Sequence, residues 1–146
     1  MKQLIVVTLI GLTLLGCKNT NSNCGLAYFG GEIINPNNDH LILYDSTSHP
    51  IDTLYLDEEN RFFYPIENLN PGLFSFVHGG EYQVVLLEPN DSIMIRLNTY
   101  DFDESLVFTG KGSKKNNYLL SLFIDIESEN KNMYELGKKT EPESFQ

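Results

Sequence analysis

The two cysteines carry the most distinctive chemistry in this chain, and both lie near its N-terminus. Cys17 and Cys24 are seven positions apart within LLGCKNTNSNC (14–24). A redox site of the thioredoxin type needs a Cys-x-x-Cys spacing, which the sequence does not contain. Two cysteines and three scattered histidines also give no zinc-ligand spacing. The pair therefore points away from dithiol and zinc chemistry.

The segment before Cys17 has the features of a bacterial lipoprotein leader. Residues 1–3 carry one positive charge, and 4–16, LIVVTLIGLTLLG, carries none. This run is too short for a membrane-spanning helix, which needs about 20 apolar residues. LLGC (14–17) resembles a lipobox, although the commonest pattern has a smaller residue than Leu15. We expect cleavage before Cys17, a diacylglyceryl group on its thiol and a third acyl chain on its amine, which together give firm anchoring.

A lipid thioether on Cys17 would exclude a disulfide with Cys24. Cys24 would then be a lone thiol in a polar, flexible tether, and a disulfide would form only if lipidation failed. Residues 18–21 carry no acidic signal of the kind that sends some lipoproteins to the cell surface. The sequence thus predicts a lipid-anchored protein that faces the periplasm, on the inner or outer membrane.

Length and charge narrow the classes of partner. Removing 16 of the 146 residues leaves 130, which is enough for one domain with a core. The formal net charge of −10 becomes −11 when Lys2 is removed with the leader. Such an acidic chain repels nucleic acid and anionic lipid headgroups, so membrane contact is expected through the acyl chains on Cys17 alone.

Regularly spaced turn signals between residues 26 and 109 predict a mainly β domain. Clusters rich in Gly, Pro, Asn and Asp recur about every ten residues, as in sandwiches and barrels. Gly79-Gly80 indicates a two-residue hairpin, and Gly30-Gly31 indicates a bulge in the first strand. Ile93, Ile95 and Leu97 should share one face. We expect an antiparallel β-sandwich or partly open barrel of about eight strands, at 26–34, 40–44, 51–56, 61–66, 73–78, 81–88, 92–97 and 105–109.

After Gly112 the spacing of the hydrophobic residues changes from that of a strand to that of a helix. Apolar residues recur at the three-and-four spacing of one helical face, and Ser113 is a suitable start. The pattern fades over 127–132, which predicts a break. The stripe comprises Tyr118, Leu119, Leu122, Phe123 and Ile126, with Met133, Tyr134 and Leu136 after the break. Its apolar face must be buried on the sheet or on a partner.

The predicted organisation is a signal peptide (1–16), a flexible tether (17–25), a β-sandwich domain (26–112), a helical linker (113–136) and an exposed tail (137–146).

The segment GKGSKKN (110–116) invites comparison with a phosphate-binding loop. A P-loop needs G-x-x-x-x-G-K-[ST] after a buried strand, so that backbone N–H groups surround the phosphates. Here the glycines are two apart and the lysines fall within the expected first helical turn. The segment is better interpreted as a helix start.

Other residues with catalytic or metal-binding chemistry are better explained as structural. The acidic groups 57–59 and 101–104 lack the ordered pattern of an EF-hand, so we interpret them as solvated turns. His40, His49 and His78 are far apart in the sequence, and no serine lies in a G-x-S-x-G motif. The seventeen Tyr and Phe residues fit a packed core, with a sugar-binding platform as the alternative. We predict no catalytic residue, no cofactor and no metal site.

Four segments, in order and spacing, resemble a domain of unknown function found N-terminal to lipid-anchored, thioredoxin-like (TlpA/peroxiredoxin-like) thiol–disulfide oxidoreductases of Gram-negative bacteria. They are FGGEI (29–33), IDTLYLDEENRFFY (51–64), VVLLEPNDSIMIRL (84–97) and LVFTGKGSKKNNYL (106–119). The resemblance covers residues 27 to about 123. Asn60 and Asn90 stand where the family prefers glycine, and asparagine also tolerates the left-handed conformation.

Members of that family usually continue into a thioredoxin-like domain with the Cys-x-x-Cys site, which this sequence lacks. The resemblance therefore implies a non-catalytic accessory domain that positions or recognises partners in envelope thiol–disulfide chemistry. Two other interpretations stay open. The chain is a truncated oxidoreductase, or it is a stand-alone lipoprotein that binds a glycan or a nutrient.

Overall fold

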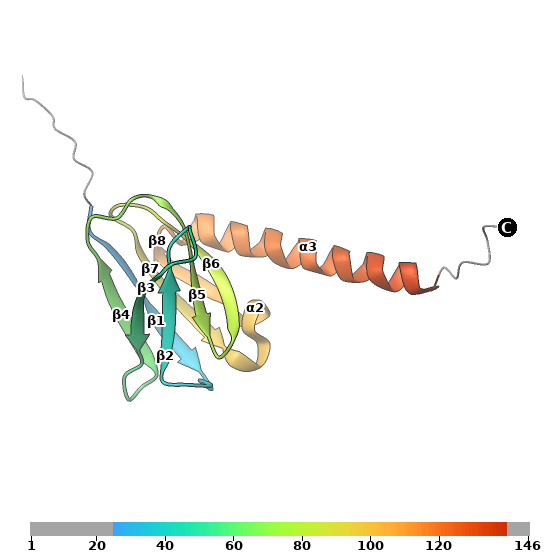
Figure 1. Ribbon diagram of the computed structural model, residues 1–146, viewed down its shortest axis with the longest axis horizontal. Helices are drawn as coiled ribbons and strands as arrows, with labels where there is room; N and C mark the ends of the chain where they lie inside the picture. Colours follow the sequence, from blue (N-terminus) through green and yellow to red (C-terminus); the bar gives the residue numbers. More distant parts are fainter. Residues whose placement is uncertain (1–24, 140–146) are drawn as a thin grey trace, which may run out of the picture.

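The computed structural model describes residues 25–139 and shows a two-layered β-sandwich from which a long helix projects (Figure 1). Sheet A has the strand order β4-β1-β7-β8, and sheet B has the order β3-β2-β5-β6, without closure into a barrel. The expected mainly β sandwich of about eight strands followed by a helix is confirmed. The elements are β1 (Ala27–Ile34), β2 (His40–Tyr44), β3 (Pro50–Tyr55), β4 (Arg61–Ile66), β5 (Gly72–His78), β6 (Glu81–Leu87), β7 (Ser92–Asn98), η2 (Thr99–Asp101), α2 (Phe102–Ser105), β8 (Val107–Lys111) and α3 (Ser113–Lys139).

The core lies between the two sheets and follows the alternation of the strands. Ile93, Ile95 and Leu97 of β7 are all buried, as their spacing predicts. Phe29 on β1 packs against Phe76 on β5, with ring centroids 5.6 Å apart. This pair joins the two sheets, because β1 belongs to sheet A and β5 to sheet B.

Strand β1 differs from expectation in two ways. It pairs with β7 in parallel, so sheet A is mixed, whereas all the other paired strands are antiparallel. The bulge predicted at Gly30-Gly31 is wrong, since β1 keeps an unbroken register with both neighbours. Instead, a glycine is needed at position 31 because the backbone of the neighbouring strand β7 lies very close to it. A Cβ there would lie 2.2 Å from the carbonyl oxygen of Ile95 on the adjacent strand.

The tight turns follow the chemistry of their residues. Gly79 and Gly80 join β5 to β6 as a two-residue hairpin with φ of 63° and 94°, which are the positive values that a type I′ turn requires. Asn60 and Asn90 also have positive φ, 59° and 68°. Asparagine therefore adopts the left-handed conformation at both positions, which it tolerates better than most residues.

Helix α3 is unbroken from Ser113 to Lys139, so the break predicted over 127–132 is wrong. The helix also runs three residues beyond the boundary expected at 136. Its polar middle continues the backbone hydrogen-bond ladder between the two apolar ends of the helix. Near its end, Lys138 lies 3.7 Å from Glu135 and 4.3 Å from the ring of Tyr134, which supports the last turns.

The face of α3 that packs on the sandwich is not the predicted stripe. Leu120 is buried and Ile124 packs against the core, whereas Tyr118, Leu122 and Ile126 are 68%, 44% and 50% exposed. Figure 1 shows why the distal half is exposed, since α3 extends well beyond the sandwich. The stripe predicted as a buried face is thus largely a surface feature of the described chain.

Candidate functional site

The GKGSKKN segment holds the start of α3, and its Lys115 is already paired with two carboxylates. Lys115 Nζ lies 2.6 Å from carboxylate oxygens of both Asp91 and Glu88. The Asp91 carboxylate also stands beside Gly112, where a Cβ would lie 2.6 Å from its Oδ1. Burial lowers the pKa of Lys115, but hydrogen bonds to the two carboxylates outweigh it and raise the pKa overall. A carboxylate thus occupies the position that a phosphate would need.

The acidic turn at 57–59 is organised by Asp57. Its Oδ1 accepts hydrogen bonds from the backbone N–H of Glu59 at 3.0 Å and of Arg61 at 2.8 Å. The bond from Arg61 is the main reason that the pKa of Asp57 is lowered. The second acidic group, 101–104, falls in η2 and α2. Within residues 25–139, no group of three His, Cys, Asp or Glu side chains is placed to hold a metal ion.

The three histidines have separate structural surroundings. His78 is buried, with Nδ1 2.8 Å from the carbonyl oxygen of His40 and Nε2 accepting from the N–H of Asn37 at 3.1 Å. The ring of His40 itself lies 2.8 Å from Asp39. His49 contacts Thr47 in the loop before β3. Each histidine is thus held by contacts within its own part of the fold, and His78 is more deeply buried than its position at a strand end suggested.

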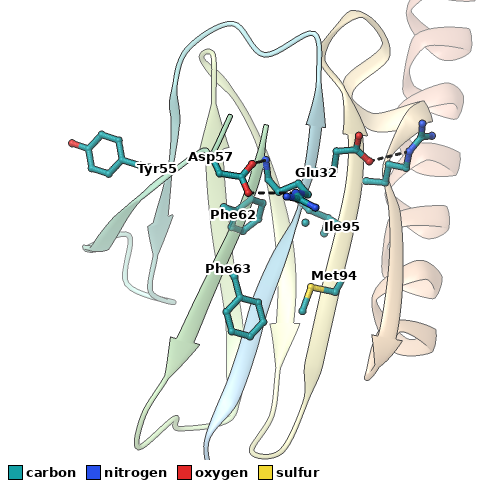
Figure 2. A pocket seen from close by; sticks show the side chains of 10 residues that line it. Glu32, Tyr55, Asp57, Phe62, Phe63, Met94 and Ile95 are labelled. Atoms are coloured by element: carbon teal, nitrogen blue, oxygen red, sulfur yellow. Dashed lines mark hydrogen bonds and ion pairs between the residues drawn. The ribbon is translucent and has the colours of Figure 1, made fainter. Parts of the chain in front are cut away.

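The outward surface of sheet A carries an open depression of about 530 Å³ that sequence reasoning did not predict. Its apolar end is formed by Phe63 on β4 and Met94 on β7, which are both paired in register with Gly30 on the strand between them (Figure 2). Phe63 is 61% exposed and stacks on Tyr28, with ring centroids 5.2 Å apart. A glycine at the centre of this row leaves the large flanking side chains on either side of a bare backbone.

The opposite end of the depression is charged. Glu32 lies directly beyond Gly30 on β1, and it pairs in register with Arg61 and Arg96 on the flanking strands. Arg96 Nε is 3.5 Å from Glu32, and Arg61 is 3.3 Å from Asp57 (Figure 2). These pairs are exposed to solvent and therefore contribute little to the stability of the fold. Their remaining donors and acceptors stay accessible from solvent.

The depression therefore combines an aromatic and thioether surface with guanidinium and carboxylate groups a few residues away. This combination suits an amphipathic ligand, with apolar contact at one end and directional hydrogen bonds at the other. Tyr55 also borders the depression but points away from the other side chains in Figure 2. The sequence did carry one signal, because a glycine inside a strand often marks close approach to a neighbouring group.

The predicted lipid attachment site, Cys17, and the lone thiol Cys24 lie outside the described residues, as does the proposed leader 1–16. In the described part of the chain, no helix combines the length and apolar character needed to cross a bilayer.

Comparisons with known proteins find little. No protein-family model matches the sequence, and no curated protein matches it. Among solved structures, a weak structural neighbour is a DUF3823 family protein, a domain of unknown function, from Parabacteroides merdae ATCC 43184. The TM-score is 0.35 and the identity 14%, and the match covers 60% of this chain. The chain spans about half of that protein's length, with 47% covered.

Proposed function

We propose that this protein is a membrane-anchored, periplasm-facing lipoprotein whose sandwich is a non-catalytic binding domain for envelope thiol–disulfide chemistry. The observation that carries the binding role is the depression on sheet A, where Phe63 and Met94 lie beside the Glu32–Arg96 pair. The anchor and the location rest on the lipobox that ends in Cys17. The redox context rests on the four-segment resemblance described above.

The non-catalytic assignment is supported by how the titratable side chains are used. Asp91 and Glu88 hold Lys115 at the start of α3. His78 is fixed by two hydrogen bonds to backbone groups of the neighbouring loop and strand. Groups held in this way position structural elements and do not present a nucleophile or a general base to a substrate.

The proposal is tested by site-specific photocrosslinking in the bacterial envelope. A photoreactive amino acid at Phe63 should capture a Cys-x-x-Cys oxidoreductase or its protein substrate, identified by mass spectrometry. The same amino acid at Tyr82 on β6 is the matched control, because Tyr82 is also aromatic and is 60% exposed on the other sheet. Capture of the same proteins from both positions, or of none from Phe63, would contradict the proposal.

Two further measurements separate the parts of the proposal. Metabolic labelling with a fatty acid should mark the chain, and Cys17→Ser should abolish that label. Purified protein should show no reduction of insulin, because the chain contains no Cys-x-x-Cys pair. Insulin reduction by the chain alone would overturn the non-catalytic assignment and favour a truncated oxidoreductase.

The Tyr28–Phe63 stack favours a second candidate, a lipoprotein that binds a sugar in the same depression. Aromatic faces beside charged hydrogen-bonding groups are a common arrangement for amphipathic ligands. A thermal-shift screen of mono- and oligosaccharides tests this candidate. A ligand present at 100 times its dissociation constant should stabilise the fold by about 2.7 kcal/mol, and Phe63→Ala should remove that effect.

A further inference from the structure

The outer face of sheet B is largely apolar, whereas the solvent side of an antiparallel sheet is normally polar. Leu43, Phe76 and Val85 are buried in the core, so the alternate residues of β2, β5 and β6 point outward. These outward residues align across the three strands in two rows, Ile42–Val77–Tyr82 and Tyr44–Ser75–Val84. Tyr82 is 60% exposed, so this face is open to solvent.

The outer face of sheet B also lacks the acidic character of the whole chain, whose net charge is −10. Within the described strands β2, β3, β5 and β6, the acidic residues are Asp52 and Glu81. Asp52 alternates in step with buried Leu54, and Glu81 with buried Gln83, so both belong to the inward side. The net charge predicted that the acyl chains alone would touch the membrane, but charge repulsion acts over only about 8–10 Å. A face without carboxylates can therefore approach a bilayer.

The tether reaches the sandwich at one end of this face. A Cβ on Gly25 would lie 2.5 Å from the Cβ of Pro89, and Pro89 comes two residues after the end of β6. The row of the outer face nearest to this turn is Leu86 with its register partner Leu73, which is 45% exposed. Glu81, at the start of β6, lies at the opposite end. The apolar end of the face is thus next to the tether, and the acidic end is remote from it.

We propose that the outer face of sheet B rests on the surface of the bilayer, with the Leu73 end closest to it. This inference rests on the anchor at Cys17 in the proposed function. Gly25 is eight residues after Cys17, a separation of at most about 25–30 Å in a fully extended chain. Since the two sheets of a sandwich are about 10 Å apart, the tether can bring sheet B onto the bilayer. Weak apolar contacts then suffice, because the anchor makes them intramolecular.

Tyrosine is well suited to this location. Its ring is apolar and its hydroxyl group remains hydrated at the level of the lipid headgroups, as for Tyr44 and Tyr82 on this face. With sheet B on the bilayer, sheet A faces away from it. The depression beside Phe63 and Met94 then stays accessible to a protein partner.

Tryptophan fluorescence tests this orientation, because the chain contains no tryptophan and an introduced one reports alone. Residues 17–146 with Cys24→Ser are coupled through the Cys17 thiol to a maleimide phospholipid. The vesicles contain phosphatidylethanolamine, phosphatidylglycerol and brominated phosphatidylcholine. The bromine atoms should quench Leu73→Trp at least about threefold more strongly than Val107→Trp. Val107 is the matched control, because it is 48% exposed and alternates with buried Phe108 on the outer side of sheet A.

A carboxylate placed on the face gives a second readout. Ser75→Glu should lower the quenching of Leu73→Trp to the level of Val107→Trp, because the glutamate would lose water and meet anionic headgroups. Thr109→Glu, on the outer side of sheet A, should leave the quenching unchanged. Far-ultraviolet circular dichroism should match that of the parent chain in both variants, which separates loss of contact from loss of fold.

Two results would overturn the contact with the bilayer. Quenching at Val107→Trp equal to or stronger than at Leu73→Trp would show that sheet B does not face the lipid. A dimer of the lipid-free chain that Ser75→Glu abolishes would assign the face to a second copy. The anchor is judged separately by the fatty-acid label on Cys17. An absent label would remove the anchor and this proposal with it, whereas an absent difference in quenching would remove only the contact of sheet B.

Discussion

Asn116 forms with Leu86 the reciprocal pair of hydrogen bonds that a neighbouring strand would form. Its Oδ1 accepts from the N–H of Leu86 at 2.6 Å, and its Nδ2 donates to the Leu86 carbonyl at 2.9 Å. Asn117 does the same with Phe108, at 3.0 Å and 2.8 Å. Because Leu86 lies on β6 and Phe108 on β8, two consecutive asparagines attach α3 to both sheets. This attachment sets the rotation of the helix.

Replacing Asn116 with alanine should destabilise the fold by about 1–3 kcal/mol. The substitution leaves two backbone groups of Leu86 without partners beneath the helix, and Asn116 is only 1% exposed. Urea unfolding followed by circular dichroism measures the change. Tyr118→Ala is the matched control, because Tyr118 lies two residues further along the helix, is 68% exposed and should change stability by less than about 0.5 kcal/mol. Equal effects of the two substitutions would contradict the role assigned to Asn116.

Lys115→Met should destabilise the protein by about 2 kcal/mol or more. Without the ammonium group, Asp91 keeps a carboxylate of which only 7% of the side chain is exposed and loses its countercharge. Arg96→Met is the comparison, since it removes an ion pair whose partners are 68% and 47% exposed and should cost at most about 1 kcal/mol. Chemical denaturation at pH 7 distinguishes the two outcomes. A larger loss for Arg96→Met would show that the buried pair does not hold the helix start.

The start and the orientation of α3 differ in how well the sequence predicted them. Ser113 as the first helical residue follows from the glycines before it and from the change of period, and the structure confirms it. Which face of the helix is buried could not be predicted from the sequence. Periodicity shows only where apolar residues recur along a helix, not which of them contact the sheets. Two polar residues decided the orientation, since Asn116 and Asn117 bind strand backbones that no local pattern reveals. Leu120 and Ile124 were thereby turned inward.

Stability should fall as the pH drops below about 6.5, in part because of His78. Burial lowers the pKa of His78 below its usual 6.5, so the native state holds the neutral ring while the unfolded state takes up a proton. The unfolded state therefore binds more protons in this range, and acid favours it. Thermal unfolding between pH 7.5 and 5 measures the slope. His78→Gln should flatten it, because glutamine does not titrate in this range. An unchanged slope in this variant would contradict the contribution assigned to His78.

Two glycine-to-alanine substitutions should act in opposite directions. Gly31→Ala places a Cβ 2.2 Å from the Ile95 carbonyl oxygen and should destabilise the protein by about 1–3 kcal/mol. Gly137→Ala lies in the exposed end of α3, where a Cβ would have no neighbour within 4 Å. It should increase helicity, with a gain of about 0.5–1 kcal/mol for that turn. Circular dichroism during urea unfolding reports both changes.

The candidate site shows where sequence reasoning stopped. Strand periods predicted that Phe63 and Met94 lie on strands, but not that both point outward across Gly30. That arrangement depends on the parallel pairing of β1 with β7, which brings together segments more than 60 residues apart. The turns were more predictable, because they depend on local residue type. Gly79, Gly80 and Asn60 all adopt the positive φ that these turns require.

The asparagine contacts also bear on aggregation. The outer strand of a sheet offers unpaired N–H and C=O groups to any other extended chain, and such exposed edges are common starting points for fibrils. On β6 and β8 those groups are partly occupied by Asn116 and Asn117. The other two outer strands each contain a proline, Pro50 in β3 and Pro65 in β4, which has no N–H to offer. A single substitution that frees Leu86 would therefore expose a template for strand addition, and self-assembly into cross-β material could begin while most of the sandwich is still folded.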